Sequence, residues 1–221
     1  MQSLKYLRYF FYLATNWNIR IAFHILRNEI KGEKHFGIDT TGADELKNLE
    51  ENGIDISSAT IYMPASYDVM EEFFTKINLS SYKHFLDIGC GKGRAMCVAA
   101  SYNIPKVSGV EFSKDLYNDT RKNIKAIEEK YPNTEFDIYN NDAFYFEIDD
   151  DVDCVFMFNP FDETIMNGVI ENIETSVENN PRKITIIYIN PLLKDVLNEW
   201  GYKQVYHSKK LKYLEGSVFE K

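Results

Sequence analysis

The sequence has few of the residues that build disulfide frameworks and metal sites. It contains three cysteines and four histidines among 221 residues. Cys90, Cys97 and Cys154 are odd in number, lie in apolar or glycine-rich stretches, and lack paired metal-ligand spacing. This pattern predicts reduced thiols and no zinc site. Because the histidines are also scattered, we expect a cytoplasmic protein without a bound metal.

Long apolar runs and an excess of basic residues are also absent. The sequence has no run of about 18 apolar residues, so no membrane-spanning helix is expected. The 25 Lys and Arg residues are outnumbered by 34 Asp and Glu residues, which gives a formal net charge of −9. That balance disfavours a nucleic-acid partner, which requires a basic face. Lys209, Lys210 and Lys212 form one small basic cluster, which we interpret as a solvated hairpin.

The rest of the composition is that of an ordinary globular chain, with 44% hydrophobic and 27% charged residues. The length is sufficient for one sizeable domain with an extension. We expect residues 1–75 to form a mainly helical N-terminal extension and residues 76–221 to form the main domain. The stretch "SYDVMEEFFTKI" predicts a short helix that begins near Ser66 or Asp68.

The N-terminal stretch "LKYLRYFFYLATNW" combines basic residues with an apolar stripe at helical spacing, which includes Leu4, Leu7 and Phe11. It lacks the small-residue cleavage site of a signal peptide. We expect a helix that packs on the domain or on a second subunit. The alternative is peripheral contact with a membrane surface through an amphipathic helix within residues 4–27. The oligomeric state stays open.

After residue 80 the pattern changes to apolar strands that alternate with helical stretches. The strand candidates are "HFLDIG", "KVSGVEF", "EFDIYN", "DCVFMFNPF" and "ITIIYIN", and "YKQVYHS" with "GSVFE" predicts a terminal hairpin. The expected fold is α/β: a Rossmann-like, doubly wound, mostly parallel sheet with a C-terminal antiparallel hairpin and the helical N-terminal extension. In such sheets a ligand binds beyond the carboxyl ends of the strands.

A glycine loop, "FLDIGCGKG" at residues 85–93, stands at the end of the first strand. The dinucleotide fingerprint requires a third Gly or Ala three positions after the second, where this chain has Arg94 or Met96. A phosphate loop requires Ser or Thr after its lysine, but Lys92 is followed by Gly93. Both absences disfavour a nicotinamide enzyme and a nucleotide triphosphatase.

What remains is Asp-x-Gly-x-Gly-x-Gly, which closely resembles the first motif of the class I S-adenosylmethionine-dependent methyltransferases. The resemblance implies S-adenosyl-L-methionine as the cofactor. Gly89, Gly91 and Gly93 would let its amino-acid tail and ribose approach the backbone and would supply unusual dihedral angles. Asp87 would serve the cationic amino group of the cofactor.

Acidic residues follow the next two strands. Glu111 ends the second strand, 24 positions after Asp87, and by resemblance it is the acid that takes both ribose hydroxyls. Asp142 follows the third strand, where the family uses an acid to accept from the adenine amino group. Phe112 and Ala143 are then the expected apolar and backbone neighbours of the base.

The fourth strand ends in "FMFNPF", residues 156–161. This resembles the Asn/Asp-Pro-Pro-Tyr/Phe motif of amino-methylating enzymes, although the second proline is missing. The resemblance implies that Asn159 holds a nitrogen nucleophile and that Phe161 stacks on a planar group, with Pro160 between them. In the alternative interpretation, Pro160 only ends the strand and begins a helix. Asp162 and Glu163 are expected to cap that helix.

A wider resemblance covers nearly the whole chain. The blocks "FGIDTTG", "YMPASY", "FLDIGCGKGRAM", "VSGVEFS" and "FMFNPF" together are similar to a bacterial family of class I methyltransferases that has no established acceptor. "YMPASY" also resembles the upstream segment of non-SET protein-lysine methyltransferases, which closes over the cofactor. It implies Thr60, Tyr62, Pro64 and Tyr67 as lid residues, and Tyr62 as a cofactor contact. Tyr62 and Tyr67 fit a core role equally well.

We therefore expect a methyltransferase that acts on a protein side chain or a small molecule, at nitrogen. The alternative is a non-catalytic S-adenosylmethionine-binding partner or sensor module. The intact glycines and the two acids favour catalysis, because an inactive module can lose some of them. The sequence identifies neither the acceptor nor a general base.

Overall fold

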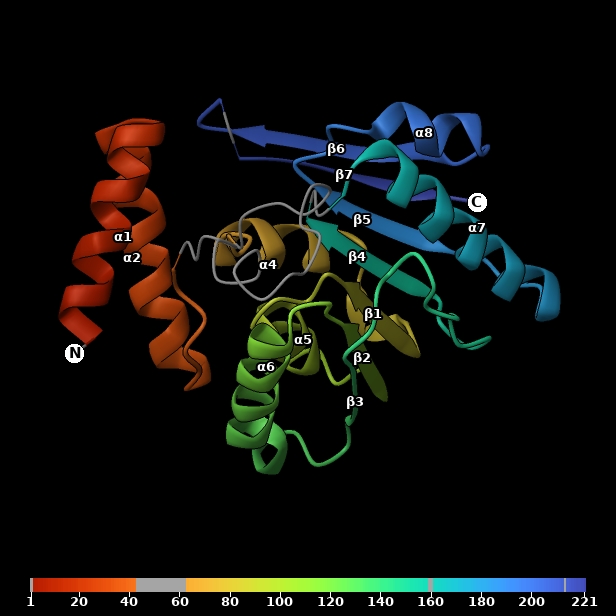
Figure 1. Ribbon diagram of the computed structural model, residues 1–221, viewed down its shortest axis with the longest axis horizontal. Coiled ribbons are helices and arrows are strands. Elements are labelled where there is room, and N and C mark those ends of the chain that lie inside the picture. The colour runs from red at the N-terminus through yellow and green to blue at the C-terminus, as the bar shows by residue number, and fades with distance from the viewer. Residues whose placement is uncertain (1, 43–62, 159–160, 213) are drawn as a thin grey trace.

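The computed structural model describes residues 2–42, 63–158, 161–212 and 214–221 (Figure 1). Within them, seven strands form one sheet in the order β3-β2-β1-β4-β5-β7-β6. The strands are β1 (His84–Ile88), β2 (Lys106–Val110), β3 (Glu135–Tyr139), β4 (Cys154–Phe158), β5 (Thr185–Ile189), β6 (Lys203–Lys210) and β7 (Leu214–Glu220). β1 to β5 are parallel, and β7 is antiparallel to β5 and β6. The predicted mostly parallel sheet with its C-terminal hairpin is confirmed.

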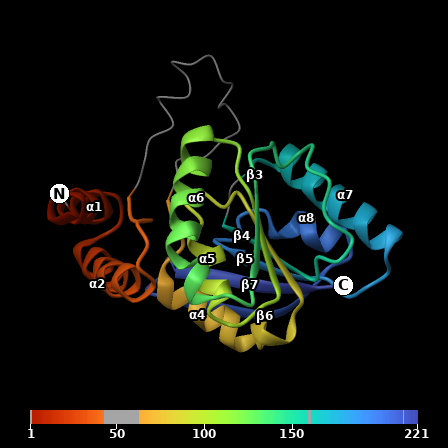
Figure 2. The same cartoon turned by 90° about the horizontal axis from the view of Figure 1, so that it is seen from below.

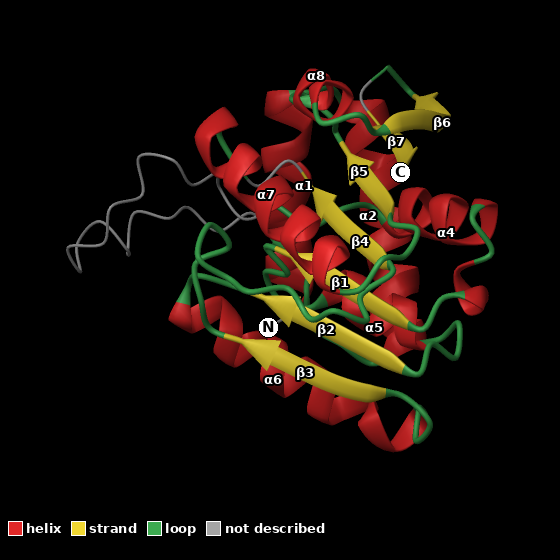
Figure 3. Ribbon diagram, turned by 90° about the vertical axis from the view of Figure 1, so that its right-hand side faces the viewer, coloured by secondary structure: helices red, strands yellow, loops and turns green. Residues whose placement is uncertain are grey.

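Helices cover both faces of this sheet. On one face lie α4 (Tyr67–Lys76), α5 (Arg94–Ala100) and α6 (Lys114–Ile127), and on the other lie α7 (Glu163–Asn179) and α8 (Lys194–Glu199) (Figure 2). Short 3-10 turns span Leu79–Ser81 and Glu128–Lys130. Figure 3 shows that β1 to β4 end at the same edge of the sheet, where a ligand of such a fold would bind.

The strand sequences explain why the sheet is covered on both faces. All five residues of β1 and all five of β5 are buried. Along β1, Phe85 packs with Phe74 of α4 and Phe156 of β4, with ring centroids 5.5 and 6.0 Å away. Leu86 and Ile88 belong instead to the core beneath α7. Continuous apolar strands of this kind are stable only between two helical layers.

The N-terminal helices form a hairpin, α1 (Gln2–Asn16) and α2 (Ile19–Phe36), at one side of the molecule (Figure 1). Asn18 caps α2 by accepting a hydrogen bond from the Ile21 amide at 3.0 Å. α2 packs on the domain, where the ring of Phe36 stacks on that of Tyr67 with centroids 5.8 Å apart. No described helix is long and apolar enough to cross a bilayer.

The packed face of α1 agrees with only part of the stripe that the sequence predicts, which Leu13 extends. Tyr9 and Leu13 are buried against α2, with 3% and 0% exposed. Leu4, Leu7 and Phe11 are each more than half exposed. Both faces of α1 are apolar, so periodicity alone could not show which one packs inward.

The start of α4 agrees with the sequence, because Ser66 is its N-cap residue. The Ser66 hydroxyl donates to the carboxylate of Asp68, and its oxygen accepts from no backbone amide of the helix. Asp162 caps α7 as expected, accepting from the Ile165 amide at 2.9 Å.

Candidate active site

The glycine loop joins β1 to α5 in a conformation that requires glycine. Gly89, Gly91 and Gly93 have φ angles of +76°, +57° and +77°, which side chains other than glycine rarely adopt. The Gly89 amide donates to the carbonyl of Val110 at 2.9 Å, so the loop begins as an extension of the pairing with β2. A β-carbon at Gly93 would lie 2.8 Å from a methyl group of Thr120. The unusual dihedral angles predicted for this loop are therefore observed.

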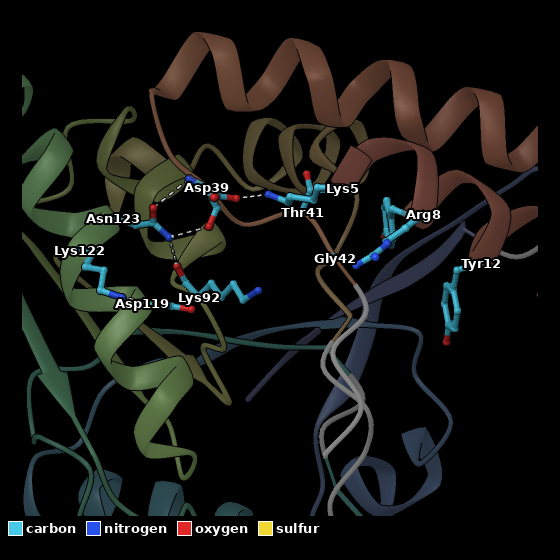
Figure 4. A pocket seen from close by; sticks show the side chains of 11 residues that line it. Lys5, Arg8, Tyr12, Asp39, Thr41, Gly42, Lys92, Asp119, Lys122 and Asn123 are labelled. Atoms are coloured by element: carbon cyan, nitrogen blue, oxygen red, sulfur yellow. Dashed lines mark hydrogen bonds and ion pairs between the residues drawn. The ribbon is translucent and has the colours of Figure 1, made fainter. Parts of the chain in front are cut away.

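Side chains of α6 hold the loop from outside. The Thr120 hydroxyl donates to the carbonyl of Gly91 at 2.6 Å, and the Asn123 amide donates to that of Lys92 at 2.9 Å. Asn123 also exchanges two hydrogen bonds with the backbone of Asp39, at 2.9 and 3.1 Å (Figure 4). The residues after α2 are thereby fixed to the glycine loop. The sequence analysis did not identify Thr120 and Asn123. The sequence indicates them only as two polar residues spaced three apart on the buried face of a predicted helix.

Two buried carboxylates lie beside the loop. Asp87 is 3% exposed and Glu111 is 9% exposed. The Glu111 carboxylate accepts hydrogen bonds from the amides of Gly91 and Ser113, both at 2.8 Å. Burial raises the pKa of Glu111 to about 6, and burial together with the charge of Glu111 raises the pKa of Asp87 well above its usual range. No cationic side chain of the described residues pairs with either acid, so the site favours a cationic ligand.

The remaining predicted cofactor contacts follow β2 and β3 at the same edge. The Asn140 side chain donates to the carbonyls of Glu111 and Phe112, both at 2.9 Å, and so ties the ends of these two strands together. Asp142 is half-buried and accepts from the Phe144 amide at 2.9 Å, while Ala143 is buried. Phe112 is 42% exposed, which leaves its ring available to a ligand. Asn140 was not singled out from the sequence.

The predicted acceptor residues are only partly described. Asn159, Pro160 and Tyr62 lie outside the described residues, as does Thr60. Phe161 is half-buried and packs against the core beneath α7. Tyr67, a candidate for the lid, is 3% exposed between Phe36 and the Arg94 guanidinium, which matches its alternative assignment as a core aromatic.

A small cavity of about 140 Å³ lies at the carboxyl ends of β4 and β5, under the helical hairpin. Its apolar wall includes Ile21 and Ile25 of α2 and Phe158 of β4. Tyr9 and Asn190 bring polar groups to it. Tyr9 is buried, with 3% exposed. Asn190 also has a φ angle of +51°, and local strain of this kind often occurs at functional sites.

A larger, polar cavity of about 590 Å³ lies between α1 and α6 (Figure 4). Lys5, Lys122, Asp39 and Asp119 line it. Both of its carboxylates pair with lysines, since Lys5 contacts Asp39 and Lys122 lies 2.8 Å from Asp119. The buried acids at the glycine loop, whose charges have no such partners, are therefore the better candidate site.

A buried ion pair attaches α2 directly to the loop. Arg94, the first residue of α5, donates through both terminal nitrogens to Glu29, at 2.7 Å for Nη1, and through Nε to Thr40 at 2.8 Å. Glu29 is 0% exposed and Arg94 is 3% exposed. In the sequence, Arg94 served only to exclude a dinucleotide site, because nothing local indicates a partner 65 residues away.

One group of potential metal ligands in the described chain lies at the amino end of β1, away from the glycine loop. It consists of His84, Asp149 and Asp151. Both ring nitrogens of His84 already have partners, Asp151 at 2.7 Å and Ser108 at 2.6 Å. Asp149 in turn accepts from Lys106 at 2.9 Å. These contacts explain the cluster as a structural network.

Comparison with known proteins assigns the family. The profile of the methyltransferase-domain family matches residues 79–219. Because the match covers more than half of the sequence, the chain belongs to this family. No curated protein matches the chain.

Solved structures with a similar fold include a SAM dependent methyltransferase from Aquifex aeolicus, with TM-score 0.53 and 13% identity over 68% of this chain and 88% of that one. The putative methyltransferase yhhF from Escherichia coli has TM-score 0.53 and 16% identity over 72% and 89%. An RNA methyltransferase from Salinibacter ruber, solved with S-adenosyl-L-homocysteine, has TM-score 0.51 and 14% identity over 72% and 92%. At these identities the likeness shows the fold.

Proposed function

We propose that the protein is an S-adenosylmethionine-dependent methyltransferase. The observation that carries the proposal is the pair of buried carboxylates, Asp87 and Glu111, beside a loop of three glycines with positive φ. S-adenosylmethionine supplies a positively charged ammonium group, two ribose hydroxyls and an electrophilic methyl group on sulfur. The two carboxylates can bind the ammonium group and the ribose hydroxyls. The glycines allow both of these groups to approach the backbone. Membership of the methyltransferase-domain family supports the same assignment.

Different residues of the chain bind different groups of the cofactor. Asp87 binds the amino group and Glu111 binds the ribose hydroxyls. The amides of Gly91 and Ser113 fix the orientation of the Glu111 carboxylate before the cofactor arrives. Asp142 accepts from the adenine amino group, with Phe112 and Ala143 against the base.

The N-terminal extension, residues 1–75, is proposed to close over the cofactor, with Tyr62 as a contact. Two features support this proposal: the Glu29–Arg94 pair and the link through Asn123 both attach the extension to the glycine loop.

The acceptor is proposed to be a nitrogen of a protein side chain or a small molecule, held by Asn159 with Pro160 and Phe161. The cavity that begins at Phe158, one residue before Asn159, supports this placement. Its size of about 140 Å³ resembles that of an apolar cavity of roughly 150 Å³ that stays dry and binds benzene. It would therefore take an apolar group about as large as one ring and exclude water from it.

Transfer of tritium from methyl-labelled S-adenosylmethionine into fractionated extract of the source organism tests the function. Label in protein or small molecules supports the proposal, and label only in nucleic acid or lipid contradicts the proposed acceptor. Tight cofactor binding without any transfer would favour a non-catalytic binding module.

Ile25→Trp, which fills the cavity, should lower transfer and leave cofactor affinity unchanged. Ile30→Trp, on the exposed side of α2, is the matched control and should change neither.

A further inference from the structure

The outer face of the α1–α2 hairpin is apolar over both helices. Six large apolar side chains project from it with exposed fractions between 44% and 61%: Leu4, Leu7, Phe11, Ile19, Phe23 and Ile30. The ring of Phe10 joins the two helices, with centroids 5.7 Å from Phe11 and 4.8 Å from Phe23. The exposed side chains therefore form one continuous surface and not isolated positions, which marks a site of interaction.

The exposed charged side chains of the hairpin are positive. Four exposed cationic side chains of α2 flank the apolar surface: Arg20, Arg27, Lys31 and Lys34. None of them lies within ion-pair distance of a carboxylate in the described part of the chain. The two acidic residues of the helices, Glu29 and Glu33, are buried, with 0% and 4% exposed. Glu29 binds Arg94, and Glu33 accepts from the amide of Thr40.

This arrangement contrasts with the rest of the protein, which has a net charge of −9. Elsewhere some exposed lysines pair with acids, as Lys122 does with Asp119 and Lys209 with Glu215. The hairpin thus concentrates unpaired positive charge and exposed apolar surface on one face. Figures 1 and 2 place that hairpin at one side of the molecule, where a flat partner can reach it.

We propose that the outer face of α1–α2 docks on a membrane surface with anionic headgroups. The two helices would lie in the plane of the interface, with Phe11 and Phe23 between the headgroups and the cations against phosphates. Apolar side chains flanked by Lys and Arg are the feature of helices that lie on bilayers. A second copy of the chain fits less well, because a symmetric contact would place four cations against four. The inference is independent of the methyltransferase proposal.

Sedimentation of the full chain with lipid vesicles tests this docking. Vesicles with equal parts of phosphatidylcholine and phosphatidylglycerol should bind the protein, and vesicles of phosphatidylcholine alone should bind it weakly. High salt should reduce the binding, because the electrostatic attraction is screened. Arg20→Gln and Arg27→Gln should each reduce the partition coefficient about fivefold, the value for losing one cation near an anionic surface.

The double variant Phe11→Ser/Phe23→Ser should abolish sedimentation. Val205→Ser and Lys203→Gln, exposed on β6, are the matched controls and should sediment like the wild type. Circular dichroism spectra should be equal in all variants, which shows that they remain folded. Failure to bind anionic vesicles, or binding that survives the double phenylalanine variant, would overturn the proposal. A dimer in ultracentrifugation that the double variant dissociates, without vesicle binding, would show that a second copy covers this face.

Discussion

The buried pair of Glu29 and Arg94 gives a prediction about how the N-terminal helices are held. Glu29→Gln keeps the shape of the side chain but removes the charge that neutralises Arg94, which is 3% exposed. Removing one partner of a buried ion pair lowers the free energy of unfolding by about 3–5 kcal/mol. Arg94 would keep acceptors that include Thr40 and the carbonyl of Ala65, the latter at 3.0 Å. We therefore expect a loss near the lower limit, about 3 kcal/mol.

Urea unfolding measures this loss directly, and thermal unfolding should show a decrease in melting temperature of about 6–12 °C. Glu171→Gln, on the exposed side of α7, is the control and should change the free energy of unfolding by less than about 0.5 kcal/mol. The double variant Glu29→Gln/Arg94→Gln should lose much less than the sum of the single losses, because the two residues interact. A loss below about 1 kcal/mol for Glu29→Gln would contradict this prediction, since it would mean that the buried charge of Arg94 does not need the carboxylate of Glu29.

Three further predictions concern the glycine loop and its acids. Gly91→Val, at a φ of +57°, should abolish cofactor binding in calorimetry while circular dichroism shows a folded domain; unchanged affinity would place the site elsewhere. Glu111→Ala should weaken cofactor binding by about 1.5–3 kcal/mol, whereas Asn159→Ala should lower turnover with affinity intact; equal losses of affinity would refute this division. Because the pKa of Glu111 is raised from 4.5 to about 6, its contribution to stability falls by about 2 kcal/mol as the pH rises through that interval. Glu111→Gln should remove this fall in urea unfolding of the free protein, and an identical pH profile for both proteins would disprove it.

Local patterns were sufficient for the fold and for the glycine loop. Apolar strands alternating with helical stretches predicted the parallel sheet, and the spacing of Gly89, Gly91 and Gly93 predicted their positive φ angles. Glu111 could be found because it ends a strand next to that loop. Each of these signals lies within a strand or the loop directly after it, where sequence spacing determines position in space.

Contacts between distant segments could not be predicted in this way. Thr120 and Asn123 hold the loop from α6, and Glu29 reaches Arg94 from α2. Such partners depend on how the helices pack against one another. The spacing of residues within one helix gives no information about that packing. For the same reason the two apolar faces of α1 could not be distinguished before the burial of Leu13 was known.

Titration calorimetry of the purified protein with S-adenosylmethionine, S-adenosylhomocysteine and NAD tests whether this protein is an S-adenosylmethionine-binding enzyme. We predict binding of the first two ligands, a loss of affinity in Glu111→Ala, and no binding of NAD. Binding of NAD without affinity for S-adenosylmethionine or S-adenosylhomocysteine would contradict it.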